Sequence, residues 1–168
     1  MKQVLLILVV VVIILGVGVI LFLTANESPQ DLPPLGEAIE IQGANHIAEG
    51  AAHEEYNSNP PTSGSHYAQA AAWGFYDEQL PDEQLIHSLE HGGIWISYKD
   101  VDDQVKERLE LIARRNSGSV IVTLRPENDT KISLASWGRL ENLEGLDEEK
   151  INNFIRANKN KSPEPIAR

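Results

Sequence analysis

The sequence predicts an α+β protein in which a small, mainly antiparallel sheet is covered by helices and is preceded by one transmembrane helix. A long apolar run near the N-terminus predicts the membrane span. In the rest of the chain, segments with apolar residues at helical spacing are interleaved with short segments in which apolar residues alternate. Two of the alternating segments follow each other closely, which is typical of an antiparallel hairpin. Together these patterns indicate a single small domain behind a membrane anchor.

Residues 4–23 form the apolar run and contain no charged or polar side chain. As a helix, a run of this length spans about 30 Å, which is the hydrocarbon thickness of a bilayer. The hydrophobic region of a secretory signal peptide is shorter and ends in a small-x-small cleavage site. Here Leu23 occupies the position ahead of Ala25 where such a site needs a small residue. We therefore expect an uncleaved transmembrane helix.

The charges on either side of this run predict its orientation. Lys2 precedes the run, whereas Glu27 and Asp31 follow it without a nearby cation. By the positive-inside rule, residues 1–3 form a cytoplasmic stub and the rest of the chain is exported. We thus expect a single-pass protein of the cell membrane with an extracytoplasmic domain. The proline-containing residues 24–38 are expected to form the linker between them.

The composition narrows the classes of partner and of chemistry. The formal net charge is −11, and a strongly acidic chain repels nucleic acid and anionic lipid headgroups, so nucleic acid is not an expected partner. The N-terminal helix is the only predicted contact with the membrane, and no particular protein partner is indicated. No cysteine is present, which excludes disulfides, thiolate metal sites and a cysteine nucleophile. The exported domain must therefore fold through its hydrophobic core alone.

We expect the exported α+β domain to occupy residues 39–158, and residues 159–168 to form a flexible tail because they show no periodicity. The first helix of the domain is predicted over residues 81–91. Pro81 suits the first helical turn, and the acidic residues after it lie near the positive end of the helix dipole. Gly92 is the expected left-handed residue that ends the helix.

The remaining elements alternate between strands and helices. Residues 93–98 are rich in β-branched and aromatic residues and predict a strand. Residues 100–116 place apolar residues at helical spacing. Residues 119–126 and 131–138 predict two strands that pair as a hairpin across the turn between them. A last helix, starting at an aspartate cap, is predicted over residues 146–158.

The motif His-Ser-Leu-Glu-His at residues 87–91 is the main candidate for chemistry. On a helix, His87 and His91 are one turn apart, which allows two imidazoles to share one metal ion. They are expected to point away from the apolar stripe of the helix, with Glu90 at its border. The motif also matches the H-x-x-E-H pattern of the inverzincins, in which the histidines bind zinc and the glutamate is the general base. An inverzincin needs a third protein ligand, and the spacing of the following residues identifies none.

A second candidate segment, Asn-Pro-Pro-Thr-Ser-Gly-Ser-His-Tyr, lies upstream at residues 59–67. Its two prolines stiffen the backbone and Gly64 permits a positive φ, so the imidazole of His66 is expected to have a fixed direction. The same segment could equally form only a tight surface turn. His46 lies in another turn-rich segment, and His53 is expected to be an exposed residue.

These motifs resemble a bacterial and archaeal family of unknown function. Its members share a Pro-Pro-Thr-Ser-Gly-x-His turn, a His-Ser-Leu-Glu-His-Gly helix end and usually an N-terminal membrane span. The resemblance covers roughly residues 40–164. It implies that five residues belong to the pattern of the family, whereas His53 does not clearly belong. These five are His46, His66, His87, Glu90 and His91. Ser65 stands where many relatives carry proline, which is expected to loosen the turn.

The candidate residues support three functions of different classes. In the first, the exported domain captures or buffers a divalent metal ion. The expected ligands are His87, His91 and His66, with His46 or Glu90 either as a fourth ligand or as a residue that supports a ligand. Imidazole suits Zn²⁺ or Cu²⁺, and soft sulfur ligands for Cu⁺ are absent because the start residue is the only methionine. In the second, a zinc-dependent hydrolase of inverzincin type uses Glu90 as general base. In the third, the histidines form a hydrogen-bond network in an interaction module without metal. The sequence does not decide between an enzyme and a binding protein.

Overall fold

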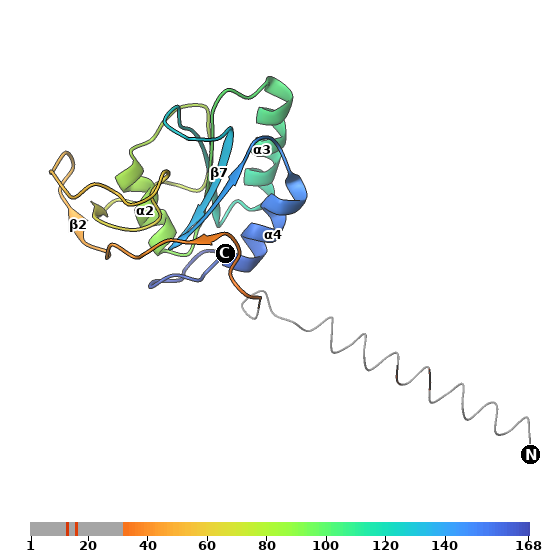
Figure 1. Ribbon diagram of the computed structural model, residues 1–168, viewed down its shortest axis with the longest axis horizontal. Helices are drawn as coiled ribbons and strands as arrows, with labels where there is room; N and C mark the ends of the chain where they lie inside the picture. Colours follow the sequence, from red (N-terminus) through yellow and green to blue (C-terminus); the bar gives the residue numbers. More distant parts are fainter. Residues whose placement is uncertain (1–12, 14–15, 17–31) are drawn as a thin grey trace, which may run out of the picture. The chain divides into compact units, whose positions relative to one another are not determined.

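The computed structural model describes residues 13, 16 and 32–168, and the chain forms two units, Met1–Leu32 and Pro33–Arg168. The expected cytoplasmic stub, nearly all of the expected transmembrane helix and about half of the expected linker lie outside the described residues. Among the residues that are described, no helix is long and apolar enough to cross a membrane. The second unit, drawn in colour in Figure 1, contains all the elements named below.

The second unit is an α+β domain built around a six-stranded sheet with the strand order β1-β8-β7-β5-β6-β4. Its strands are β1 (Glu37–Ala38), β4 (Gly74–Tyr76), β5 (Ile94–Tyr98), β6 (Val120–Leu124), β7 (Ile132–Ser136) and β8 (Arg139–Leu143). Neighbours from β1 to β5 pair antiparallel, whereas β5, β6 and β4 pair parallel. The sheet is therefore mainly antiparallel, as predicted. A separate two-stranded parallel sheet joins β2 (His46–Ile47) to β3 (His66–Tyr67).

The helices of the second unit are those that the sequence predicts, with bounds that differ by a few residues. They are α2 (Asp82–Glu90), α3 (Asp103–Arg115) and α4 (Glu148–Asn158). Two of them begin at an aspartate whose side chain accepts a hydrogen bond from a backbone N–H in the first turn. Asp102 accepts from Val105 at the start of α3, and Asp147 accepts from Lys150 at the start of α4. Such caps satisfy donors that the first turn of a helix leaves without partners.

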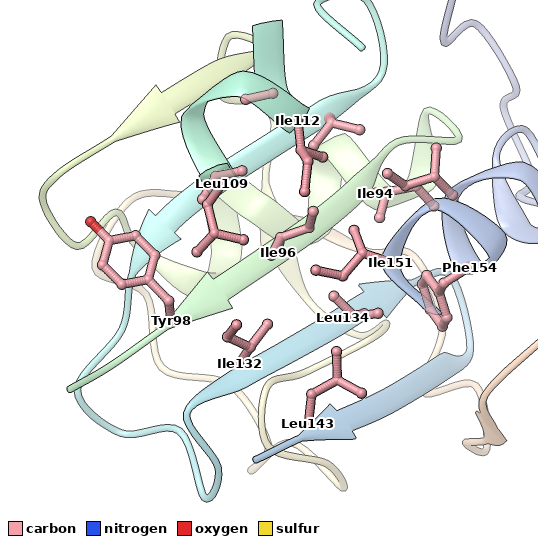
Figure 2. Packing of buried hydrophobic residues seen from close by; sticks show 14 residues of the cluster. Ile94, Ile96, Tyr98, Leu109, Ile112, Ile132, Leu134, Leu143, Ile151 and Phe154 are labelled. Carbon is pink, nitrogen blue, oxygen red and sulfur yellow. The ribbon is translucent and has the colours of Figure 1, made fainter. Parts of the chain in front are cut away.

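The two faces of the sheet carry separate hydrophobic clusters. On one face, alternate residues of β5 pack against α3 and α4, as Figure 2 shows. This cluster includes Ile94, Ile96, Tyr98, Leu109, Ile112, Ile151 and Phe154. On the other face, Trp95 of β5 packs with Leu85 and Leu89 of α2. Because successive side chains of a strand point to opposite faces, β5 is buried on both. The helix that carries the histidine motif therefore packs on the face opposite α3 and α4.

The predicted hairpin between residues 119–126 and 131–138 is wrong. Its two segments form β6 and β7, but β5 lies between them, parallel to β6 and antiparallel to β7. β7 instead forms a hairpin with β8 across Trp137 and Gly138. A central position in the sheet buries the apolar side chains on both faces of β5. The free energy gained by this burial exceeds the advantage that a short connection gives to pairing β6 with β7.

The C-terminal residues differ from the flexible tail that the sequence predicts over residues 159–168. Their backbone N–H groups donate to carbonyls at the end of α2, from Glu164 to Glu90 at 3.1 Å and from Ile166 to His91 at 3.0 Å. The last carbonyls of a helix have no partner within the helix, so this segment satisfies groups that would otherwise lack one. Similarly, the end of the expected linker forms β1 and pairs with β8.

Removal of residues 163–168 should lower the free energy of unfolding by about 1–3 kcal/mol, because the carbonyls at the end of α2 lose their donors. Urea denaturation of the full and shortened chains measures the difference. Ile166→Ala is the control, since its side chain is 64% exposed and its backbone N–H is retained, so its effect should stay within about 0.5 kcal/mol. Equal stability of the full and shortened chains would show that these hydrogen bonds contribute nothing.

Candidate metal centre

Three histidines from three elements lie around a common space. Parallel pairing of β2 and β3 places His46 directly opposite His66, and His87 lies on α2. One potential ligand nitrogen from each ring lies within 4.8 Å of those of the other two. The ring centroids are 4.8–5.1 Å apart. We call these residues the histidine trio; the closeness of His66 to His87 that the motifs predict is confirmed.

A tight turn before β3 directs His66 toward α2. Gly64 has a φ of 120°, a conformation that residues with a side chain rarely adopt. A Cβ added to Gly64 would also lie 3.0 Å from the ring of Tyr56. The hydroxyl of Tyr56 donates to the carbonyl of Ser65 at 2.6 Å. The backbone conformation of Gly64 and the hydrogen bond from Tyr56 to Ser65 therefore fix the two residues that precede His66.

His66 is fully buried, and both of its ring nitrogens have partners. Its Nδ1 lies 2.7 Å from the carbonyl oxygen of Gly64, and its Nε2 lies 3.1 Å from Oε2 of Glu90. A carbonyl only accepts, so we assign the proton to Nδ1, and in the neutral ring Nε2 then presents a lone pair. An ionised carboxylate also accepts only. A hydrogen bond between Nε2 and Glu90 therefore needs a proton on one of the two groups, and a metal ion bound to Nε2 would take the place of that proton.

His87 is oriented in the same way. Its Nδ1 lies 2.6 Å from the carbonyl oxygen of Tyr67, so Nδ1 donates and Nε2 carries the lone pair. This Nε2 lies 2.8 Å from Nε2 of His91, which must donate the hydrogen bond. Nδ1 of His91 is buried and has no hydrogen-bond partner in the part of the chain that the structure describes. The carboxylate of Glu164 is 3.7 Å from it, which is too far for a hydrogen bond.

The trio offers three nitrogen ligands that are close enough to one another to hold a metal ion. Metal-binding histidines commonly donate their second ring nitrogen to a carbonyl or carboxylate, which fixes the tautomer and the ring direction. Nitrogen ligands with an adjacent carboxylate suit Zn²⁺ and Cu²⁺. Ligands of a tetrahedral zinc ion lie about 3.3 Å apart, given bonds of about 2.0 Å. The nitrogens of the trio lie within 4.8 Å of one another, so they would have to move closer together to reach this spacing.

His46 connects the trio to solvent. Its side chain is 52% exposed, whereas that of Glu90 is 6% exposed. Nε2 of His46 lies 3.8 Å from Oε2 of Glu90, so the carboxylate stands beside two of the three histidines. An ion or a water molecule can approach the trio from the side of His46 without opening the core.

The structure buries His87, which the sequence predicts to point away from the apolar stripe of α2, whereas the side chain of His91 is partly exposed. All six residues from Leu85 to Glu90 are buried, including His87. The helix packs against β3, which supplies the carbonyl and the imidazole that the polar side chains contact. Burial is possible here because the buried polar groups find partners.

Two glycines end α2 immediately after the motif. Gly92 has a φ of 84°, its N–H donates to Leu89 at 2.9 Å, and the N–H of Gly93 donates to Ser88 at 3.0 Å. This pair of hydrogen bonds is a Schellman motif, so the left-handed end predicted at Gly92 is confirmed. A Cβ at Gly93 would overlap the ring of Trp73. The second glycine is therefore required by packing.

Three of the four histidines that the sequence predicts for the site form the trio, and His91 contacts it through His87. His53 lies apart and places its Nε2 3.3 Å from Oε1 of Glu83. Sequence reasoning missed the two backbone carbonyls that orient the buried rings. No sequence signal could have identified them, because every residue type supplies a carbonyl.

The fold and the trio together define a small α+β domain with a candidate histidine metal centre between a helix and a two-stranded sheet. The chain belongs to the family described as Protein of unknown function (DUF3105), whose model matches residues 46–168. The match begins at His46 and therefore includes the whole trio, Glu90 and His91. The comparisons with curated proteins and with solved structures gave no significant match.

The environment of His87 favours its neutral form. Burial lowers the pKa of His87 below its ordinary value, and the hydrogen bond to the carbonyl of Tyr67 acts in the opposite direction. Positive charge on His91, His66 or His46 lowers it further. Because a histidine must be neutral to bind a metal ion, this environment favours metal binding near neutral pH.

Without metal, the free energy of unfolding should fall as the pH is lowered from about 7 to about 5. The pKa of His87 is lower in the folded protein than the value of about 6.5 expected in the unfolded chain. As the pH falls through about 6.5, the unfolded state binds the proton first, and stability is lost until the folded-state pKa is passed. Urea titrations at several pH values in the presence of a chelator measure this loss.

The variant His87→Asn is the matched comparison for this pH dependence. Asparagine retains a side-chain N–H for the carbonyl of Tyr67 but does not titrate, so stability should depend less steeply on pH. A slope equal to that of the wild type would assign the pH dependence to other groups.

Proposed function

We propose that this protein is anchored in the cell membrane and binds a divalent metal ion, Zn²⁺ or Cu²⁺, in its extracytoplasmic domain. The observation that carries the proposal is the orientation of His66 and His87. In each ring, a backbone carbonyl occupies Nδ1, so Nε2 is the atom left to bind an ion, and an ion on His87 would displace the hydrogen bond from His91. His46 supplies a third nitrogen within 4.8 Å of the others. The proposed ligand set is therefore two nitrogens that hydrogen bonds orient and a third on the solvent-exposed ring of His46.

The sequence supports both the membrane anchor and a positively charged ligand. The apolar run over residues 4–23, with Lys2 before it, supports an N-terminal anchor whose start is cytoplasmic. The net charge of −11 attracts cations toward the domain. In this location the protein captures or buffers a metal ion at the outer side of the membrane.

The full chain should bind one Zn²⁺ or Cu²⁺ ion, and His87→Ala should weaken binding more than a hundredfold. Loss of a ligand costs more than the tenfold to hundredfold expected when a residue that only orients a ligand is replaced. Equilibrium dialysis against each ion, followed by metal analysis, measures both affinities. His53→Ala is the matched control, because this histidine lies outside the trio, and it should bind like the wild type.

A wild-type chain that binds neither ion at micromolar concentration would exclude the metal centre. The contacts from His66 to Glu90 and from His87 to His91 would then belong to a buried hydrogen-bond network. In that case the domain is an interaction module, and His87→Ala should lower its stability.

The position of Glu90 favours a second function, that of a zinc-dependent hydrolase. Its carboxylate is buried, 3.1 Å from Nε2 of His66 and 3.8 Å from Nε2 of His46. Zinc bound in an open site lowers the pKa of its water ligand to about 7, and an adjacent carboxylate can accept the proton as general base. The inverzincin pattern uses His87 and His91 as ligands. The trio instead joins His87 to histidines of β2 and β3.

The variant Glu90→Gln separates a metal carrier from a hydrolase, because glutamine keeps the shape of the side chain and cannot act as a base. A hydrolase should keep its metal and lose turnover of ester and amide test substrates. A carrier that uses the carboxylate as a ligand should bind the ion more weakly and show no turnover in either form. Glu164→Gln is the control, since this carboxylate is 62% exposed and stands outside the trio.

A further inference from the structure

The buried guanidinium of Arg125 contacts the first residues of two segments that carry histidines of the trio. Arg125 follows β6 directly and is 6% exposed. Its Nε donates to Oδ1 of Asp82 at 3.0 Å, and its Nη2 donates to Oδ2 of the same carboxylate at 2.8 Å. This two-point contact fixes the distance and the relative orientation of both side chains.

The third nitrogen of the guanidinium makes contacts in a different direction. Nη1 of Arg125 donates to the side-chain oxygen of Asn59 and to that of Asn128 at 3.2 Å. Asn128 is itself held by the hydroxyl of Ser97, at 3.0 Å. The carbon at the centre of the guanidinium lies 5.8 Å from the ring centre of Trp95, which packs over it. Arg125 therefore packs against Trp95 of the sheet while its guanidinium binds Asp82 and Asn59, which lie in two other segments.

Both of those segments lead to a histidine of the trio. Asp82 is the first residue of α2, which carries His87. Asn59 begins the turn-forming segment that ends in His66 at β3. The guanidinium therefore joins the starts of two segments whose later residues must come together for a metal ion to be bound.

The geometry points to Arg125 as a positioning residue that sets the separation of His66 and His87 in the metal centre. This inference rests on the proposed metal-binding function and adds a residue that contacts none of the ligands. A planar guanidinium can bind a carboxylate at two points and an amide at a third, whereas the ammonium of lysine is a single point charge. Arginine is thus the residue that can hold both segments at once.

The variant Arg125→Lys keeps the charge and loses the fixed geometry. Its affinity for Zn²⁺ should fall by about tenfold to a hundredfold, the range observed when residues that orient metal ligands are replaced. The visible absorption bands of the Co²⁺-loaded chain should also shift, because they report the arrangement of the ligands. A role in stability alone would leave those bands unchanged in the metal-saturated chain.

Arg108→Lys is the matched control. Arg108 also binds a carboxylate at two points, that of Glu148, at 2.5 and 2.9 Å, but it joins α3 to α4 on the other face of the sheet. This variant should keep the affinity for Zn²⁺ within about twofold and keep the Co²⁺ spectrum of the wild type.

The outcomes distinguish this inference from the proposed function. If the wild type binds Zn²⁺ and Arg125→Lys matches it in affinity and in Co²⁺ spectrum, the positioning role is overturned and the metal centre stands. If the wild type binds no ion, both are overturned. If Arg125→Lys does not fold, Asn59→Ala decides, since it removes the contact of the guanidinium with the segment that leads to His66, together with one hydrogen bond from Nδ2 of Asn59 to the carbonyl of Glu127. A folded Asn59→Ala chain with wild-type affinity and spectrum then overturns the positioning role.

Discussion

Two hydrogen bonds from imidazole N–H groups to backbone carbonyls are the interactions on which the candidate metal centre depends. They join His66 to Gly64 at 2.7 Å and His87 to Tyr67 at 2.6 Å. An imidazole without such a partner can rotate or change tautomer, whereas these two rings keep Nε2 as the lone-pair atom. Both carbonyls belong to the short segment around β3. The conformation of one turn therefore sets the chemistry of two histidines on different elements.

The same segment explains how α2 buries polar side chains that would be solvated on an isolated helix. His87 is 6% exposed and Glu90 is 5% exposed. Burial of polar groups is unfavourable unless hydrogen bonds replace the water that they lose. β3 provides these partners through a backbone carbonyl and the ring of His66, so an otherwise solvated helix face becomes one wall of the site. The remaining wall, at His46, stays open to solvent.

The elements that could be predicted are those that local interactions decide. The aspartate cap at Asp147 and the left-handed end at Gly92 act within one helical turn, and the sequence predicts the three helices of the second unit. Strand pairing is not local, and the short connection between β6 and β7 led to a wrong hairpin because β5 lies between them. β2 and β3 have two residues each, too few to show alternation. The hydrogen bonds of the C-terminal residues also join distant parts of the chain.

The sequence by itself determined which chemical groups are available to the site. Without cysteine, and with histidines concentrated in a few short motifs, a metal ion can be held only by nitrogen and oxygen ligands. Only the tertiary structure decided that His46 joins His66 and His87, while His91 contacts His87 from outside the trio. The physical reason is that ligand geometry depends on the pairing of separate segments and on tautomers set by backbone carbonyls. Neither of these depends on residue type at a fixed spacing, so neither leaves a pattern in the sequence.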